Sequence, residues 1–303
     1  QGILRKIVSQ EGEKLPCGSL IAVLAKDDVL EDEINIYIKS FQEKFLEDQV
    51  IKSEEEELNT ENIKINGKLI RFLKVGNNDN NTILFVHGFG SDLTTWGLNQ
   101  ATLSANNTTY AIDLPGHGGS FKEINGADTE YFSRIIIDFC KTQNISKVNL
   151  IGQSFGGGIC LYSALNHPDF VNSISLICPT SLGNEINIDY INGFINAEKR
   201  KDIKPYLQQL FSNPENITGE MINNVLKNKR LDGAKEALQK IALSIFPEGK
   251  QSLILRSSLK TLKQKNSIIW VNNDNILPLT HFNDLPSNIE IHIIENAGHM
   301  VHI

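Results

Sequence analysis

Residues 148–158 (VNLIGQSFGGG) join an apolar run to the motif G-x-S-x-G and then to a stretch of small residues. This composition predicts a buried strand, a tight turn and a helix. Glycines two residues either side of Ser154, at Gly152 and Gly156, let neighbouring backbone pass without a Cβ clash. A serine on such a turn stands clear of the sheet at the positive end of a helix. We therefore predict that Ser154 is a nucleophile; a passive serine in a glycine-rich turn is the alternative.

A glycine-spaced loop follows another apolar run. The run covers residues 82–86, and the loop consists of His87, Gly88, Phe89 and Gly90. Backbone N–H groups in such a loop can face the negative oxygen that develops during acyl transfer. We therefore expect the N–H groups of Phe89 and Phe155 to form an oxyanion hole. His87 is expected to order the loop rather than to act as a base.

A serine hydroxyl is a weak nucleophile, so it needs a base and an acid that orients the base. His299 follows a candidate strand at 290–294, and Asp274 follows one at 267–271. Their order along the chain, nucleophile then acid then base, is the order associated with a G-x-S-x-G nucleophile. We predict His299 as the base and Asp274 as the acid. Glu295 lies close to His299 in the sequence and is the alternative acid.

The remaining histidines and the cysteines show no pattern typical of catalysis. Residues 113–120 (DLPGHGGS) form a turn motif in which Asp113 and His117 are expected to serve structure. The other histidines are expected to be structural or exposed: His167, His281, His292 and His302. The cysteines lack C-x-x-C spacing and are expected to be small buried hydrophobes in a reducing compartment, with no metal site: Cys17, Cys140, Cys160 and Cys178.

From residue 62 onward, short apolar runs alternate with helical stretches, which predicts an α/β fold. The candidate strands are 68–74, 82–86, 108–112, 147–151, 173–178, 267–271 and 290–294. Residues 184–264 are helical in period and are expected to form a cap above the sheet.

Residues 1–61 have a different pattern of hydropathy and charge. Strand-like stretches at 2–8 and 19–25 precede a segment at 29–48 with helix-like spacing and an acidic run at 54–57, which predicts a solvated linker. We place a domain boundary near residue 61. Because the chain opens on glutamine rather than methionine and an apolar alternation begins at once, we expect it to start inside a domain.

Charge and hydropathy exclude some partners. The chain has 29 Lys+Arg against 36 Asp+Glu, and no basic cluster interleaved with aromatics, which argues against nucleic acid or an anionic membrane as a partner. No apolar stretch reaches the roughly 18 residues of a membrane span, and no secretory signal opens the chain. A cytoplasmic protein is expected.

Residues 62–303 resemble the α/β-hydrolase superfamily. Five motifs follow the family's order, at 87–90, 113–120, 152–156, 274–278 and 297–299. The resemblance implies an α/β-hydrolase fold with a helical cap and a triad of Ser154, Asp274 and His299. It is specific to the fold and much less so to a substrate. Because the family continues past its catalytic histidine into a closing helix, we expect that helix to be missing from this chain.

Residues 1–28 look like the second half of an all-β lipoyl domain. In that resemblance the modified lysine lies upstream of Gln1, and neither Lys6 nor Lys26 matches it. A partial lipoyl domain, a helix and acidic linker at 29–61 and a hydrolase domain at 62–303 together resemble the dihydrolipoamide acetyltransferases of acetoin dehydrogenase complexes. The H-x-x-x-D-G motif of other 2-oxo acid dehydrogenase acyltransferases is absent.

The resemblance implies that an acetyl group passes from lipoate to coenzyme A through Ser154. The implied partners are a small acyl substrate and the thiamine-diphosphate-dependent and dihydrolipoamide dehydrogenase components of a multienzyme complex. Two alternatives stay open. One is a serine hydrolase of esters, thioesters or C–C bonds, and the other is a scaffold without catalysis.

Overall fold

The computed structural model describes residues 2–10, 13, 15, 19–56, 59–77 and 81–303. It divides into two compact units, residues 1–59 and 60–303. Cys17, Glu57 and most of the turn expected between the first two strands lie outside the described residues.

The first unit holds two strands, β1 (Ile3–Ile7) and β2 (Ala22–Ala25), and the helix α1 (Glu31–Glu56). The strands pair antiparallel, with Ile3 opposite Ala25. Residues 54–56 of the predicted linker continue α1. Glutamate has a high intrinsic helix propensity, so an acidic run can extend a helix that has already begun.

The second unit is built on an eight-stranded sheet in the order β10-β9-β8-β7-β5-β6-β4-β3. The strands are β3 (Glu61–Ile65), β4 (Lys68–Val75), β5 (Thr82–Val86), β6 (Thr108–Ile112), β7 (Val148–Gln153), β8 (Val171–Ile177), β9 (Lys265–Val271) and β10 (Glu290–Ile294). β4 pairs antiparallel with β3 and with β6, and the other neighbours are parallel.

The seven predicted strands are all present; three match at both ends, and the ends of the other four differ by at most two residues. β3 was not predicted. It forms a hairpin with β4 across Asn66 and Gly67, which both have positive φ, as a tight hairpin turn requires. The structure divides after Asn59, and β3, which begins at Glu61, belongs to the second unit.

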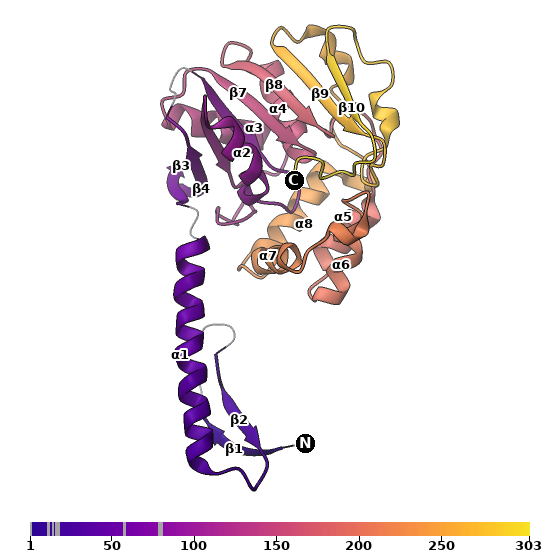
Figure 1. Ribbon diagram of the computed structural model, residues 1–303. Coiled ribbons are helices and arrows are strands. Elements are labelled where there is room, and N and C mark those ends of the chain that lie inside the picture. Colours follow the sequence, from indigo (N-terminus) through magenta and orange to yellow (C-terminus); the bar gives the residue numbers. More distant parts are fainter. Residues whose placement is uncertain (1, 11–12, 14, 16–18, 57–58, 78–80) are drawn as a thin grey trace. The chain divides into compact units, whose positions relative to one another are not determined.

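Helices pack against the sheet and cap one end of it (Figure 1). The helices α2 (Gly97–Leu103), α3 (Thr129–Thr142) and α4 (Phe155–Asn166) belong to the sheet layers. The cap consists of α5 (Ile188–Asn196), α6 (Arg200–Gln208), α7 (Gly219–Lys229) and α8 (Ala234–Ile245). Short 3₁₀ turns are η1 (Leu93–Trp96), η2 (Pro214–Asn216), η3 (Pro247–Gly249), η4 (Arg256–Thr261) and η5 (Leu279–Phe282). The helical cap expected at 184–264 is therefore present.

The central strands are continuous apolar runs in the sequence because they lie in the core. Every residue of β5 and β6 is buried, because helices cover both faces of a parallel sheet. Phe132 of α3 meets Phe155 of α4 edge to face, with ring centroids 5.0 Å apart. This packing fixes the first turn of α4, where the candidate nucleophile lies. In the described part of the chain, no helix is both long and apolar enough to cross a membrane.

Candidate active site

Ser154 lies in the turn between β7 and α4, as predicted, with φ 54° and ψ −117°. Its N–H donates to the carbonyl of Ile177 at 2.9 Å, and its carbonyl accepts from Thr180 N–H at 3.0 Å. The flanking glycines are required by close packing. A Cβ on Gly156 would lie 2.2 Å from the carbonyl oxygen of Val86. These contacts hold the serine in a conformation that non-glycine residues rarely adopt.

His299 and Asp274 meet although 24 residues separate them along the chain. His299 Nδ1 lies 2.8 Å from Asp274 Oδ2, and Asp274 Oδ1 accepts from the N–H groups of Ile276 at 2.8 Å and Leu277 at 2.9 Å. Burial disfavours the charged carboxylate, but His299 and the two N–H groups outweigh it and lower the pKa of Asp274. Glu295, the alternative acid, is exposed and is not the residue that bonds His299.

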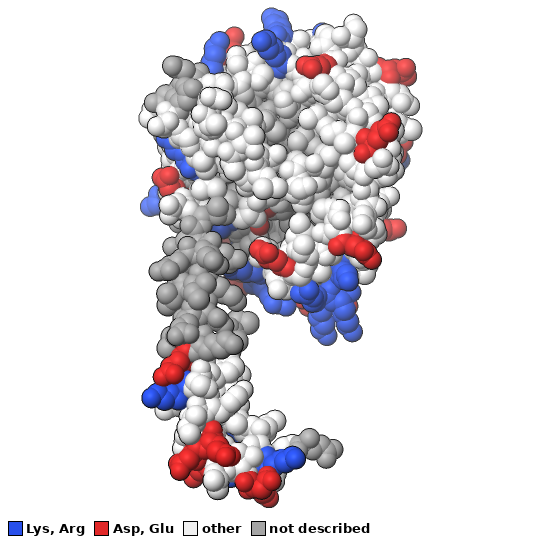
Figure 2. Space-filling view, viewed as in Figure 1, with Lys and Arg blue, Asp and Glu red and all other residues white. Residues whose placement is uncertain are grey.

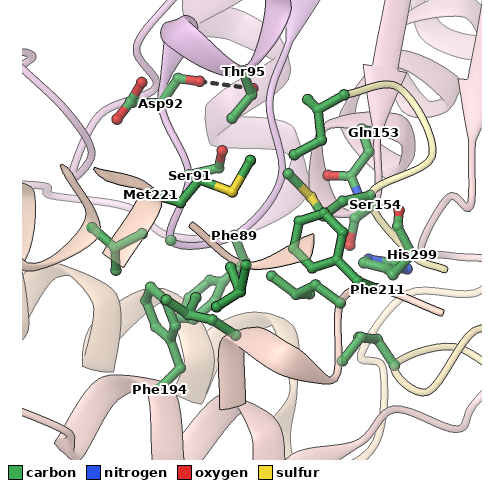
Figure 3. A pocket seen from close by; sticks show the side chains of 18 of the residues that line it. Phe89, Ser91, Asp92, Thr95, Gln153, Ser154, Phe194, Phe211, Met221 and His299 are labelled. Atoms are coloured by element: carbon green, nitrogen blue, oxygen red, sulfur yellow. Dashed lines mark hydrogen bonds between the residues drawn. The ribbon is translucent and has the colours of Figure 1, made fainter. Parts of the chain in front are cut away.

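Ser154 and His299 line one cavity, which places nucleophile and base together (Figure 3). With Nδ1 bonded to Asp274, Nε2 is the nitrogen left to face the serine. The arrangement is suited to general-base activation of a hydroxyl.

Residues of the cap and of β7 hold the loop that carries His299. Gln153 Nε2 donates to the carbonyl of His299 at 3.1 Å, and Met300 N–H donates to the carbonyl of Leu210 at 3.1 Å. A Cβ on Gly298 would lie 2.5 Å from Ser212 N. The segment that follows α6 therefore packs directly on the histidine loop, a contact that no sequence motif indicated.

The two expected oxyanion donors lie where the turn chemistry places them. Phe155 is the first residue of α4, so its N–H has no acceptor within the helix. Phe89 follows β5 and lines the same cavity as Ser154. A Cβ on Gly88 would lie 2.2 Å from Gln153 Oε1, and one on Gly90 would lie 2.3 Å from the Phe194 ring. Both glycines therefore bring the loop close to the nucleophile turn and the cap.

The predicted structural residues form a buried polar network behind this loop. His87 Nε2 accepts from Leu114 N–H at 3.0 Å. Asp113 receives Arg71 Nε at 2.5 Å and Leu93 N–H at 2.8 Å. Burial raises the pKa of Asp113 although Arg71 opposes it, and burial lowers the pKa of His87. The network links the turn at 113–120 to the loops beside it and does not reach the cavity.

The remaining histidines have other surroundings. His281 Nε2 lies 2.7 Å from Glu185 Oε2. The His302 ring packs on Trp96 with centroids 4.4 Å apart, and burial lowers its pKa to about 3. His292 is exposed and His167 lies half-buried at the end of α4.

Cys178 was not predicted to lie near the site. Cys140, Cys160 and Cys178 are buried and free, as expected, but Cys178 follows β8 and its Sγ lies within 4.8 Å of ligand atoms of both Asp274 and His299. Its spacing in the sequence gave no signal, because the ends of β8 and β9 meet only in the folded sheet.

The cavity has a volume of about 530 Å³ and is mainly apolar. Aromatic and aliphatic side chains surround the space in front of Ser154: Phe89, Tyr190, Phe194, Phe211, Met221 and Phe246. The lining residues that are exposed mark its mouth and lie on the η1–α2 segment, at the start of α7 and at Ile303: Thr94, Gly97, Leu98, Thr218, Glu220, Asn224 and Ile303. The site is therefore a deep apolar chamber with the reactive pair inside it and a more polar entrance.

Comparisons with known proteins show which family and which folds this chain resembles. The sequence profile of the α/β hydrolase fold matches residues 81–303. The chain is 35% identical to the dihydrolipoyllysine-residue acetyltransferase component of the acetoin cleaving system of Pseudomonas putida, over 99% of this chain and 80% of that protein. The counterpart from Cupriavidus necator is 31% identical over 99% and 79%. A solved meta-cleavage product hydrolase superposes with a TM-score of 0.71 at 22% identity, covering 80% of this chain and 92% of that one.

Proposed function

The chain belongs to the α/β-hydrolase family, and from that membership we propose that it transfers an acetyl group from dihydrolipoamide to coenzyme A through Ser154. The observation that carries the proposal is the His299–Asp274 pair at a cavity that Ser154 also lines. The names of the two relatives, acetyltransferase components of acetoin cleaving systems, supply the reaction class.

In the first half of the reaction, His299 Nε2 takes the Ser154 hydroxyl proton as Oγ attacks the thioester carbonyl. The N–H groups of Phe89 and Phe155 receive the oxyanion, each contributing roughly 3 kcal/mol. Collapse breaks the C–S bond, and His299 returns its proton to the departing dihydrolipoyl sulfur. The acetyl group is then an ester of Ser154.

In the second half, the coenzyme A thiol takes the place of the departed sulfur. His299 removes the thiol proton, the sulfur attacks the acetyl-serine carbonyl, and the same two N–H groups hold the second oxyanion. Collapse releases Ser154 with its proton restored from His299. Asp274 stays ionised throughout and stabilises the charged imidazole, which agrees with its lowered pKa.

The size of the cavity supports a donor larger than the acetyl group itself. A chamber of about 530 Å³ lined by Phe194, Phe211 and other apolar residues can hold the alkyl chain of lipoamide as well as the reacting thioester. Apolar walls also exclude water, which favours transfer over hydrolysis.

The mouth of the cavity offers a place for the acceptor. Helix α7 lines the cavity through Met221 and Asn224, and its last turn carries Lys227 and Lys229, with Arg230 next to it. Figure 2 shows basic side chains gathered at the cap helices. We place the phosphate groups of coenzyme A at this basic end of α7, with the thiol arm running along the helix into the cavity.

The proposal includes the remaining partners of the reaction. Lipoate is attached to a lysine upstream of Gln1, and it delivers the acetyl group from a thiamine-diphosphate-dependent component of the complex. A dihydrolipoamide dehydrogenase component then reoxidises the dihydrolipoyl group. The two relatives' names, which place them in acetoin cleaving systems, support this assignment.

The test supplies free S-acetyldihydrolipoamide, so that it needs no lysine outside the chain. We expect acetyl-CoA to form with wild type and with the control Ser163→Ala, whose serine is buried in α4 against Ser133. The Ser154→Ala variant should form none. Free acetate at one rate with or without coenzyme A would instead identify a serine hydrolase. Absence of both products and of fluorophosphonate labelling would identify a scaffold.

A further inference from the structure

The Asp274 carboxylate has one more neighbour than the proposed reaction uses. Its Oδ1 is held by Ile276 and Leu277 N–H groups and its Oδ2 by His299. The Cys178 Sγ also lies within 4.8 Å of ligand atoms of this carboxylate and of His299. A buried carboxylate is held most firmly when each of its lone pairs has a donor, so the thiol can complete the set.

The backbone at Cys178 is unusual. Its φ is +42°, in the left-handed region that favours glycine, although the residue is not glycine. Its N–H donates to the carbonyl of Ile269 on β9 at 2.9 Å, which ties the end of β8 to the strand that leads to Asp274. Strained backbone of this kind clusters at functional sites, where surrounding contacts enforce it.

The thiol can serve this carboxylate only as a proton donor. Burial and then the charge of Asp274 raise the pKa of Cys178 well above its ordinary value. It therefore stays protonated at working pH, which excludes it as a second nucleophile. A shared metal ion would require Asp274 and His299 ligand atoms about 3.3 Å apart, whereas their 2.8 Å separation is that of a hydrogen bond.

We propose that Cys178 is a positioning residue of the triad: its S–H donates to the Asp274 carboxylate and fixes its orientation and charge toward His299. The inference rests on the proposed role of Ser154, His299 and Asp274, and not on which acyl group or acceptor is used. A buried cysteine that only fills space would share the burial but not the bond to the acid.

The test follows labelling of Ser154 by a fluorophosphonate across pH, which reads the triad without any acyl substrate. In Cys178→Ala we expect labelling about tenfold slower, because the carboxylate loses a donor and its fixed position. With one donor fewer, the Asp274 carboxylate stabilises the protonated form of the base more strongly. The acid limb of the pH profile should therefore move about half a unit to higher pH. The His302 ring also lies near His299, but burial lowers the pKa of His302 to about 3, so it is neutral at these pH values.

Two comparison variants separate positioning from packing. Cys178→Ser keeps a donor and should restore the wild-type acid limb. Cys140→Ala removes an equally buried thiol of α3 and should leave both rate and profile unchanged. A Cys178→Ala profile that matches wild type, or equal slowing in the Ala and Ser variants with no movement of the acid limb, would show that the cysteine only packs.

A measurement on the unmutated thiol keeps the proposal falsifiable if Cys178→Ala does not fold. The infrared S–H stretch should contain one band lowered by hydrogen bonding to a carboxylate, and that band should move in Asp274→Asn. An unchanged band would overturn the proposal. If Ser154 reacts with the fluorophosphonate while acetyl transfer fails, the proposed function is wrong but Cys178 can still be judged.

Discussion

Ser154 carries backbone strain that its neighbours enforce. A non-glycine residue at φ 54° and ψ −117° costs on the order of 1–3 kcal/mol. The backbone of the turn is held in this conformation by hydrogen bonds to Ile177 and Thr180 and by the close approach of Gly156 to Val86. The result is a hydroxyl at the first turn of α4, beside the loop that carries Phe89.

The strain at Ser154 predicts a difference between two inactive variants. Ser154→Gly and Ser154→Ala both lose the hydroxyl and should both lose at least about a thousandfold in acyl transfer. Only glycine relaxes the positive φ, so Ser154→Gly should be more stable than Ser154→Ala by about 1 kcal/mol in urea unfolding. Equal stabilities would show that the turn is not strained in solution.

Asp274 should matter through the proton on His299. In Asp274→Asn the amide presents a donor or a weaker acceptor to Nδ1, so the ring loses its tautomer and orientation. We expect kcat to fall by about ten thousandfold, with KM changed little. The matched control is Glu295→Gln, an exposed acid close to His299 in the sequence. A large loss in the control instead would assign the acid to Glu295.

At the residue scale, the sequence predicted candidate site residues that belong to recognisable motifs. It did not predict Cys178, whose place near the site depends on contacts formed only in the folded chain. Ser154, Asp274 and His299 each follow a strand, so local pattern and chain order were sufficient to name them. Cys178 was assigned to the core, because its nearness to Asp274 depends on how β8 and β9 lie side by side. No spacing rule carries that information.

Helix α7 joins two parts of the proposed reaction. Met221 and Asn224 face the cavity, and Lys227 is one turn further along the helix from Asn224. Basic residues in a last turn also complement the helix dipole, so their presence alone does not assign a role. The acceptor's phosphates provide the means to distinguish the two roles.

The double variant Lys227→Gln with Arg230→Gln tests the phosphate site. Loss of two charges should raise KM for coenzyme A on the order of tenfold while kcat changes little. With pantetheine, which has the same thiol arm but no nucleotide, KM should match wild type. The control is Lys147→Gln, an exposed lysine just before β7 at the opposite end of the strand from Ser154. An equal change for both acceptors would move the phosphates elsewhere.

The strands that form apolar runs in the sequence were located to within two residues, from the fully buried β5 and β6 to the exposed β10. The hairpin strand β3 has mixed exposure and a glutamate at its start, so it resembled the linker before it. The acidic run predicted as a solvated linker continues α1 through residue 56, because a helix requires only local propensity once it has begun.

Across the whole molecule, charge is divided unevenly. Residues 1–59 hold twice as many acidic as basic side chains, whereas residues 60–303 hold equal numbers. The net negative charge of the chain therefore belongs to the first unit. The second unit carries no net charge that would repel an anionic acceptor.

The second unit also holds buried histidines whose protonation in the folded state is disfavoured by burial. His117 lies beside His87, with ring centroids 5.0 Å apart, and its Nε2 has no partner among the described residues. Burial, and then the neighbouring His87, lower the pKa of His117 well below its ordinary value. Both rings are therefore neutral in the folded protein and protonate in the unfolded chain.

This difference predicts loss of stability in acid. Above about pH 6.5 both states of His117 are neutral, so it contributes nothing to the pH dependence. As pH falls below that value, the unfolded chain binds a proton that the native ring refuses, and stability falls by about 1.4 kcal/mol per pH unit. His117→Phe keeps a ring against Phe89 but cannot titrate, so its urea unfolding free energy should fall less steeply from pH 7 to about pH 5. The exposed control His292→Phe should keep the wild-type slope. Equal slopes in all three proteins would show that His117 takes up its proton without unfolding, which would require the turn at 113–120 to open in acid.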